Sequence, residues 1–239
     1  MQAVPDAGPS PYTSLNSLNS ARVVVPLVRG FVPAQSVVDF GCKHGEWLSV
    51  FREHGSSRLR GFDLEKRIGH GLLIRDDEFV VADLRQPVPL ADRFDLAVCI
   101  EVAEHLPESA AAPLVKTLTS AAPAILFSAA VPGQGGHGHL NEQPRQYWTE
   151  LFEAEGFTTL DCLRPRIWQD ANVAWWYRQN LFLVCNEEMK RSPGLRAEAA
   201  RDVAGDLDLV HVDILNRNVF RGLASSVVSG LSRRLKRTR

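Results

Sequence analysis

The sequence has neither a long apolar run nor an excess of charge of one sign. Its 239 residues include 27 Lys and Arg against 28 Asp and Glu, for a formal net charge of −1. Because affinity for nucleic acid comes from accumulated Lys and Arg, this balance argues against a general nucleic-acid-binding protein. No stretch reaches the roughly 18 to 20 apolar residues of a membrane span, and the N-terminus lacks the basic patch and apolar core of a secretion signal. We therefore expect a cytoplasmic protein that binds a small molecule; the sequence leaves open whether it acts as a homodimer.

Cysteine is also scarce. The four cysteines, Cys42, Cys99, Cys162 and Cys185, show no C-x-x-C spacing and lie in or beside predicted buried strands. This pattern fits reduced core thiols better than disulfides or a zinc site. With 45% hydrophobic and 23% charged residues, the chain has the composition of an ordinary globular domain with room for an α/β core.

The stretch SVVDFGCKHGEW, residues 36–47, organises the rest of the chain. Val37, Val38 and Phe40 are typical of a buried parallel strand. Gly41 and Gly45 allow backbone conformations and close approaches that a Cβ would block, and the apolar spacing after them predicts a helix. A strand, a glycine-rich turn and a helix in this order are typical of a cradle for a small cofactor.

Short strands alternate with helices along the chain. We expect further strands at 58–63, 79–83, 94–100, 124–129, 158–163 and 181–185, and helices after an N-cap at Asn19 or Ser20, at 110–119 and at 145–155. This alternation predicts a parallel, doubly wound α/β sheet, in which the last two strands, separated only by a loop, form a hairpin. The SLNSLN repeat before the first helix is either a polar loop or a lid, and Arg191–Gly194 is a helix breaker.

Acids mark the ends of the first three strands: Asp39, Asp63 and Asp83. In nucleotide-binding α/β folds, an acid at the end of the second strand accepts hydrogen bonds from ribose hydroxyls. The spacing resembles that of the class I S-adenosylmethionine-dependent methyltransferases, in which a D-x-G-x-G-x-G turn precedes a second-strand acid and a third-strand Asp-Leu pair. A dinucleotide dehydrogenase is the main rival, but an acid two residues before the first glycine suits a cationic cofactor and repels a pyrophosphate.

This resemblance covers Tyr12 to Asn186 and implies a Rossmann-like, mostly parallel seven-stranded sheet with an antiparallel last strand. It implies a methyltransferase domain at 12–190, while composition and pattern predict a disordered arm at 1–11 and a helical extension with a basic tail at 191–239. The resemblance places S-adenosylmethionine on Asp39, Gly41, Cys42 and Gly45 (methionine), Asp63 (ribose), Asp83 and Leu84 (adenine), and Glu101 (methyl group). The middle glycine of the family turn is Lys43 here, and a side chain restricts φ at that position. Its ammonium either meets the methionine carboxylate or points to solvent.

Two segments carry groups for chemistry at the carboxyl ends of the later strands. CIEVAEHLPE contains Glu101, Glu104 and His105, and the loop SAAVPGQGGHGHLNEQ contains His137 and His139. His105 or His139 could act as a general base on a substrate hydroxyl or amine. Alternatively, E-x-x-E-H followed by a distant His resembles the divalent-metal site of the small-RNA 2′-O-methyltransferases and, more loosely, that of the ubiquinone-biosynthesis O-methyltransferases. That resemblance implies that Glu101, Glu104, His105 and His139 hold Mg²⁺ or Mn²⁺, with His137 as an alternative ligand; otherwise Glu101 touches the cofactor and the others pair locally.

The aromatic segment RPRIWQDANVAWWYRQN, residues 164–180, has two interpretations. It either covers an edge of the sheet, or its rings stack on an acceptor that an arginine clamps. The candidate substrate contacts are His137, Asn141, Gln143, Tyr147, Trp168 and Arg178.

The sequence thus predicts an S-adenosylmethionine-dependent methyltransferase (EC 2.1.1.-) that methylates an oxygen of a small molecule. The run from YTSLNS through EVAEHL and PGQGGHGHLNEQ to WYRQN resembles bacterial class I methyltransferases of natural product biosynthesis or glycan decoration, and this resemblance implies a specialised metabolite or a sugar as the acceptor. Two alternatives stay open: a catalytically weak cofactor-binding scaffold, and an RNA 2′-O-methyltransferase, against which the near-neutral charge argues.

Overall fold

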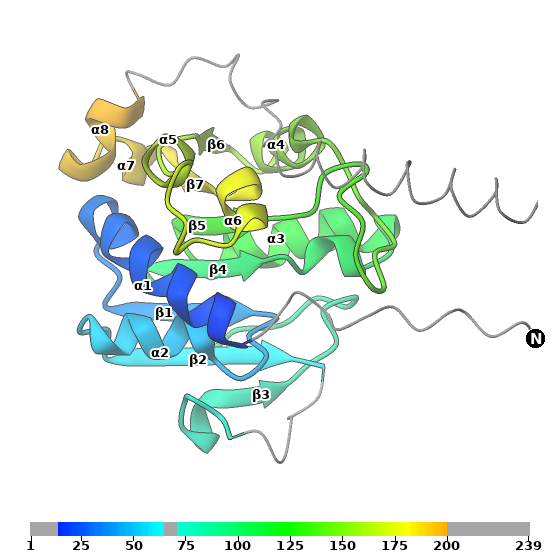
Figure 1. Cartoon of the computed structure of the whole chain (residues 1–239), viewed down its shortest axis with the longest axis horizontal. Helices are drawn as coiled ribbons and strands as arrows, with labels where there is room; N and C mark the ends of the chain where they lie inside the picture. The colour runs from blue at the N-terminus through cyan, green and yellow to red at the C-terminus, as the bar shows by residue number, and fades with distance from the viewer. Residues whose placement is uncertain (1–13, 65–70, 200–239) are drawn as a thin grey trace, which may run out of the picture. The chain divides into compact units, whose positions relative to one another are not determined.

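The computed structural model describes residues 14–64 and 71–199, which form a seven-stranded sheet in the order β3-β2-β1-β4-β5-β7-β6 (Figure 1). The strands are β1 (Ser36–Phe40), β2 (Arg58–Asp63), β3 (Phe79–Val81), β4 (Leu96–Ile100), β5 (Ala124–Ser128), β6 (Phe157–Leu160) and β7 (Phe182–Asn186). β7 runs antiparallel to both β5 and β6, and the other neighbouring strands are parallel. The predicted Rossmann-like, mostly parallel sheet with an antiparallel last strand is confirmed.

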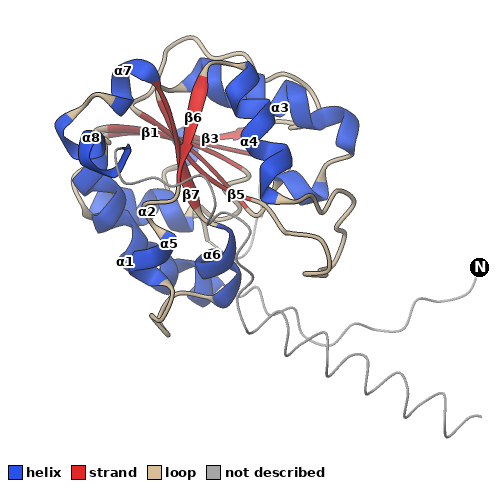
Figure 2. Cartoon of the chain, turned by 90° about the horizontal axis from the view of Figure 1, so that it is seen from above, coloured by secondary structure: helices blue, strands red, loops and turns tan. Residues whose placement is uncertain are grey.

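Helices cover both faces of this sheet (Figure 2). One face carries α1 (Ser14–Phe31), α2 (Glu46–Glu53), α5 (Arg164–Ile167), α6 (Trp175–Asn180) and α8 (Pro193–Ala199); the other carries α3 (Ala111–Ala121) and α4 (Arg145–Ala154). The remaining helical segments are the short α7 (Glu187–Lys190) and the 3₁₀ turns η1 (Asp76–Glu78), η2 (Ala103–His105) and η3 (Glu108–Ala110).

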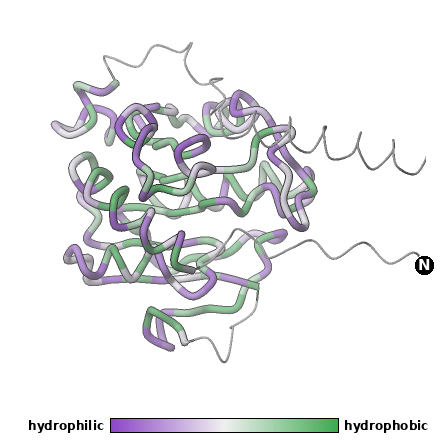
Figure 3. Tube along the Cα trace, in the orientation of Figure 1, coloured by the Kyte–Doolittle hydropathy of each residue, from purple (hydrophilic) through white to green (hydrophobic). Residues whose placement is uncertain are grey.

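The strands supply apolar side chains to both faces, so the sheet separates two hydrophobic clusters. In β4, Leu96, Val98 and Ile100 pack into the cluster under α1 and α2, whereas Ala97 and Cys99 pack under α3 and α4. Because successive strand residues point to opposite faces, a central strand covered on both sides must be apolar throughout. Figure 3 shows this as hydrophobic colour along much of the central strands.

The predicted strands were located to within three residues. The second strand has the expected bounds, Arg58–Asp63, whereas β3 ends at Val81, two residues before Asp83. The expected helices at 110–119 and 145–155 correspond to α3 and α4. All four cysteines are buried and free, as predicted.

The start of the first helix was predicted wrongly. α1 begins at Ser14, so the SLNSLN repeat is helical and neither Asn19 nor Ser20 is an N-cap. The Ser20 hydroxyl instead donates to the Asn16 carbonyl within the helix at 2.7 Å and accepts from the Ala174 amide at 3.0 Å. This contact with a segment 154 residues away stabilises a helical turn that local sequence signals do not predict.

Two further predictions near the C-terminal end of the sheet need correction. The segment between β6 and β7 is not only a loop, because it contains α5 and α6, although the two strands do pair antiparallel. The predicted breaker Arg191–Gly194 is shorter than expected, because α8 begins at Pro193. Proline is tolerated in the first turn of a helix, where its missing N–H would have no partner inside the helix.

Several expectations concern residues outside the described ranges. These are the disordered arm at 1–11, Tyr12 as part of a lid, the helix near 209–228 and the basic tail, so the domain boundaries remain predictions. Within residues 14–64 and 71–199, no helix combines the length and apolar character that crossing a bilayer requires.

Candidate functional site

A cavity of about 690 Å³ opens at the carboxyl ends of the strands, where the strand order reverses between β1 and β4. This edge is where open α/β sheets bind ligands, and the volume suits a small organic molecule. The lining residues come from six parts of the chain: Ser17 from α1; Gly41, Lys43, His44 and Glu46 from the glycine turn and the first residue of α2; Asp63 and Leu64 at the end of β2; Ala82, Asp83, Leu84 and Arg85 after β3; Glu101, Val102, His105 and Leu106 after β4; and His137 and Gly138 from the loop after β5.

The glycine turn follows β1 and needs its two glycines for different contacts. Gly41 has φ of 90°, and a Cβ there would lie 2.3 Å from Val102 Cγ2. Gly45 has φ of 83°, and its Cβ would lie 2.7 Å from Ile74 Cγ2. A side chain at either position would therefore push the turn away from its neighbours and reshape the floor of the cavity.

Asp63 fixes the turn at its middle. Its Oδ2 accepts from the Lys43 amide at 2.7 Å, and its Oδ1 accepts from the Leu64 amide at 2.7 Å. Lys43 adopts φ of 50°, the left-handed conformation that a glycine would take more easily. The turn thus tolerates the lysine without being rebuilt, because Asp63 holds its backbone in place.

Acids surround this turn. Asp39 is buried beneath it, and burial, followed by the charges of Glu46 and Asp63, raises the pKa of Asp39 well above its usual value. Glu46 is buried and lines the cavity, although the sequence did not indicate it as a site residue. Its carboxylate lies 3.2 Å from both the amide nitrogen and the ring Nδ1 of His44. Since repulsion among these carboxyl groups causes part of the pKa shift, a positively charged group in the cavity would be favourable.

Asp83 and Leu84 lie on the β3 side of the cavity. The Asp83 carboxylate pairs with the Arg85 guanidinium, with Nε to Oδ1 at 2.9 Å and Nη2 to Oδ2 at 2.7 Å. These hydrogen bonds lower the pKa of Asp83. Leu84 is buried and supplies an apolar wall.

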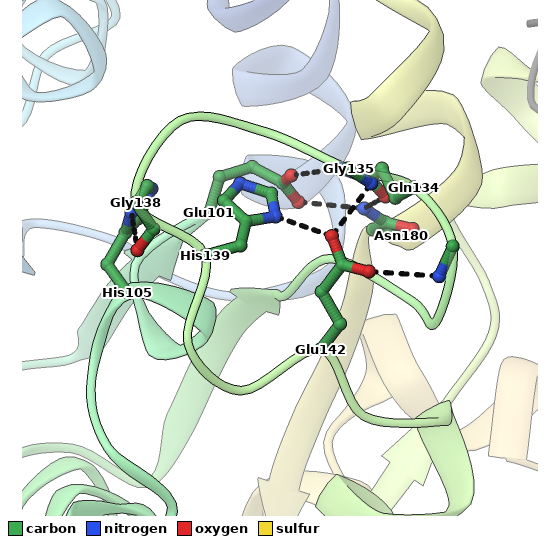
Figure 4. A network of polar contacts seen from close by, with 9 residues as sticks. Glu101, His105, Gln134, Gly135, Gly138, His139, Glu142 and Asn180 are labelled. Carbon is green, nitrogen blue, oxygen red and sulfur yellow. Dashed lines mark hydrogen bonds and ion pairs between the residues drawn. The ribbon is translucent and has the colours of Figure 1, made fainter. Parts of the chain in front are cut away.

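Glu101 borders the cavity on the β4 side and has an unusual backbone, with φ of 52°. Its buried carboxylate accepts from Asn180 Nδ2 at 2.9 Å and from Gln134 Nε2 at 3.0 Å, as Figure 4 shows. Burial raises the pKa of Glu101, and these hydrogen bonds oppose the shift. Gln134 and Asn180 were not predicted, because nothing in their local sequence indicates that two distant segments meet at one carboxylate.

Glu104 lies in the turn after Glu101 and is fully buried. Neither of its carboxylate oxygens meets a donor in good hydrogen-bond geometry among the described residues. Burial, and then the charge of Glu101, raises the pKa of Glu104 well above its usual value. The Glu104 and Ala130 backbone amides oppose this shift only in part, so the buried group calls for a cation or a proton.

His105 and His139 meet beside Glu104, with ring centroids 4.9 Å apart and nearly perpendicular planes. One ligand atom from each of Glu104, His105 and His139 lies within 4.8 Å of the other two. Burial, followed by the neighbouring His139, lowers the pKa of His105. The structure therefore brings together three members of the predicted catalytic and metal-binding set, while the Glu101 oxygens accept from amides.

The predicted substrate contacts are less concentrated. His137 lines the cavity, but Asn141, Gln143, Tyr147, Trp168 and Arg178 are not among its lining residues. Gln143 donates to Asn141 at 2.8 Å, and Arg178 donates to the Trp168 carbonyl at 3.2 Å. Their role in substrate binding remains a prediction.

Comparisons with known proteins agree with the fold. A family model described as "Methyltransferase domain" matches residues 20–125, and no curated protein matches the sequence. The fold is similar to magnesium protoporphyrin IX methyltransferase (ChlM) from Synechocystis PCC 6803, at 19% identity, with a TM-score of 0.50 over 72% of this chain and 80% of that one. It is also similar to DesVI from Streptomyces venezuelae (13% identity, TM-score 0.52) and to an S-adenosylmethionine-dependent methyltransferase from Clostridium acetobutylicum ATCC 824 (8%, 0.52), each over 72% of this chain and 92% of the other.

Proposed function

Because the chain belongs to the class I S-adenosylmethionine-dependent methyltransferases, we propose that it methylates an oxygen atom of a small molecule such as a specialised metabolite or a sugar. The observation that carries this proposal is the cavity at the strand-order reversal, with a glycine turn anchored by Asp63 and surrounded by acids. The net charge of −1 favours a small acceptor over RNA.

The residues present fit this cofactor. Asp39, Gly41, Cys42 and Gly45 would form the methionine side, where a Cβ at either glycine would clash with Val102 or Ile74 and the acids suit an ammonium and a sulfonium. Asp63 would hold the ribose, Asp83 and Leu84 the adenine, and Glu101 would border the methyl group. When bound, S-adenosylmethionine supplies an activated methyl group.

The protein must then align the acceptor and remove one proton. His105 lines the cavity, and its Nδ1 faces the Gly138 carbonyl at 3.3 Å. Because a carbonyl can only accept, Nδ1 carries the hydrogen, and Nε2 of neutral His105 is the basic atom. Where no cation is bound, we assign Nε2 of His105 as the atom that takes the acceptor proton.

Cofactor binding is tested first, by calorimetry with S-adenosylmethionine. We expect Asp63→Ala to weaken binding about 10- to 100-fold, because the variant loses a charged hydrogen-bond acceptor and the anchor of the Lys43 amide. Asp77→Ala is the matched control, since Asp77 is exposed and pairs with Arg75. Absence of binding by the wild type at millimolar cofactor would favour the scaffold alternative. Retention of RNA at physiological salt would favour an RNA methyltransferase.

The alternative form of the proposal is a divalent cation at Glu104, His105 and His139, in which the Nε2 lone pair of His105 binds the cation and His105 is not the base. It is supported by the closeness of the three ligand atoms and by the burial of the Glu104 carboxylate. Two imidazoles and a carboxylate suit a transition metal such as Mn²⁺ better than Mg²⁺, which prefers oxygen ligands, and they leave positions open for an acceptor. Such a cation would act as a Lewis acid that eases loss of the acceptor proton. Glu101 is left out of this ligand set because both of its oxygens already accept hydrogen bonds.

Mn²⁺ titration by calorimetry tests this cation site. We expect Glu104→Gln and His139→Ala to lose most of the Mn²⁺ affinity and to keep the affinity for S-adenosylmethionine, because neither side chain lines the cofactor cavity. His54→Ala is the control, because His54 is exposed at the end of α2. If the wild type binds no Mn²⁺, or if the wild type and all three variants bind it equally well, the cation site is wrong and His105 acts as a base without a metal.

A further inference from the structure

We propose that Glu142 is a positioning residue that fixes the tautomer and orientation of His139. This inference rests on the proposed function, because it explains how His139 is prepared for its role beside Glu104. Glu142 lies in the loop after β5, three residues beyond His139, and does not line the cavity.

Three N–H groups converge on the Glu142 carboxylate, and Figure 4 shows the arrangement. His139 Nδ1 and the Gly135 amide each lie 2.7 Å from Oε1, and the Gly133 amide lies 2.9 Å from Oε2. A carboxylate that receives two backbone amides is held in place from both sides. Because this ionised carboxylate can only accept, the Nδ1 of His139 must carry a hydrogen.

The consequence falls on the opposite ring nitrogen. In a neutral imidazole with its hydrogen on Nδ1, Nε2 holds the lone pair that binds a cation or a proton. Nε2 of His139 is buried and has no hydrogen-bond partner among the described residues. The ring also packs on the backbone at Gly136, where a Cβ would lie 2.1 Å from Nε2. Glu142 thus selects the tautomer, and Gly136 leaves space for the ring.

The same loop is tied to Glu104. The amides of Leu140 and Asn141 donate to the Glu104 carbonyl at 2.7 and 3.0 Å. Glu142 thus closes the loop from Gly133 to His139, and the Glu104 carbonyl holds the two residues that follow His139. A change at Glu142 is therefore transmitted to the geometry between His139 and the Glu104 carboxylate. Of the residues that line the cavity, His137 and Gly138 belong to this loop.

The tautomer can be measured without cofactor or metal. We would record ¹⁵N NMR spectra of the full chain labelled at histidine, at about pH 8, where imidazoles are neutral, and assign His139 by its loss in His139→Asn. In the wild type we expect a pure Nδ1–H tautomer. In Glu142→Ala we expect a mixture containing Nε2–H, and in Glu142→Gln, which keeps one acceptor oxygen, an intermediate result. A pure Nδ1–H signal in Glu142→Ala would overturn the proposal.

Mn²⁺ affinity provides the second measurement. Loss of a partner that orients a metal-binding histidine typically costs about 10- to 100-fold in affinity, so we expect that loss in Glu142→Ala and a smaller one in Glu142→Gln. Glu150→Gln is the matched control, because Glu150 is exposed on α4 and accepts from Gln146. Circular dichroism and affinity for S-adenosylmethionine show whether each variant is folded. If Glu142→Ala is unfolded, the test uses Glu142→Gln instead. A folded Glu142 variant that binds Mn²⁺ as tightly as Glu150→Gln does would overturn the proposal.

The two hypotheses fail differently. If the wild type binds no Mn²⁺, the cation site is wrong, and the NMR measurement alone decides the role of Glu142. If His139→Ala loses Mn²⁺ affinity while Glu142→Ala keeps both affinity and tautomer, the cation site stands and the positioning role is wrong.

Discussion

At the scale of single residues, the site contains two non-glycine residues in the left-handed conformation. Lys43 has φ of 50° and Glu101 has φ of 52°, and both line the cavity. Left-handed backbone costs an L-residue about 1 to 2 kcal/mol, so it persists only where neighbouring contacts enforce it. Asp63 enforces it at Lys43 through the amide hydrogen bond, and the Ser128 carbonyl and hydroxyl accept from the Glu101 amide at 3.0 and 3.1 Å.

Lys43→Gly should therefore stabilise the protein. We expect the free energy of unfolding to rise by up to about 1 kcal/mol, because relief of the left-handed strain exceeds the added entropy of glycine in the unfolded chain. Lys43→Ala removes the same ammonium but keeps the Cβ, so the difference between the two variants in urea denaturation isolates the backbone effect. A glycine variant no more stable than the alanine variant would show that the turn carries no such strain.

At the scale of elements, local sequence was enough for the strands but not for the contacts between distant segments. β2 and its terminal Asp63 were predicted because a buried strand and the acid that follows it are adjacent in sequence. The helical start of α1 was not predicted, because the Ser20 hydroxyl accepts a hydrogen bond from the Ala174 amide, which lies far along the chain. Likewise, the spacing of Glu104 and His105 suggested a shared site with His139. The contact between Glu142 and His139 could not be predicted, because it depends on how the loop folds.

A hydrogen-bond network joins α6, the segment after β4 and the loop after β5, and we predict that it stabilises the fold. Asn180 at the end of α6 donates to Glu101 after β4 at 2.9 Å and to Gln134 in the loop at 2.8 Å. Asn180→Ala removes a donor to a buried carboxylate, so we expect a loss of about 2 to 3 kcal/mol in the free energy of unfolding. Asn172→Ala, at an exposed position beside Asp170, should change stability by less than about 0.5 kcal/mol. A similar result for both variants would mean that the network adds no stability.

At the scale of the described part of the molecule, the cavity gathers residues from both halves of the sheet. The side of β3, β2 and β1 contributes Lys43, Asp63 and Asp83, whereas the segments after β4 and β5 contribute Glu101 and His137. A ligand that fills the cavity would contact both halves and would have to leave it before either half could unfold. Binding should therefore increase the stability of the fold as a whole.

We accordingly predict that S-adenosylmethionine raises the thermal midpoint of the full chain. At 100 times the dissociation constant, binding to the native state adds about 2.7 kcal/mol, which corresponds to roughly 5 to 10 °C for a protein of this size. The dinucleotide NAD⁺ is the matched comparison, because it also carries an adenosine but adds a pyrophosphate. The acids around the glycine turn, Asp39, Glu46 and Asp63, would repel that pyrophosphate and attract the sulfonium and ammonium groups instead. Differential scanning fluorimetry with each ligand tests this selectivity. A larger rise in the thermal midpoint with NAD⁺ would mean that the cavity prefers a dinucleotide and that the proposed cofactor is wrong.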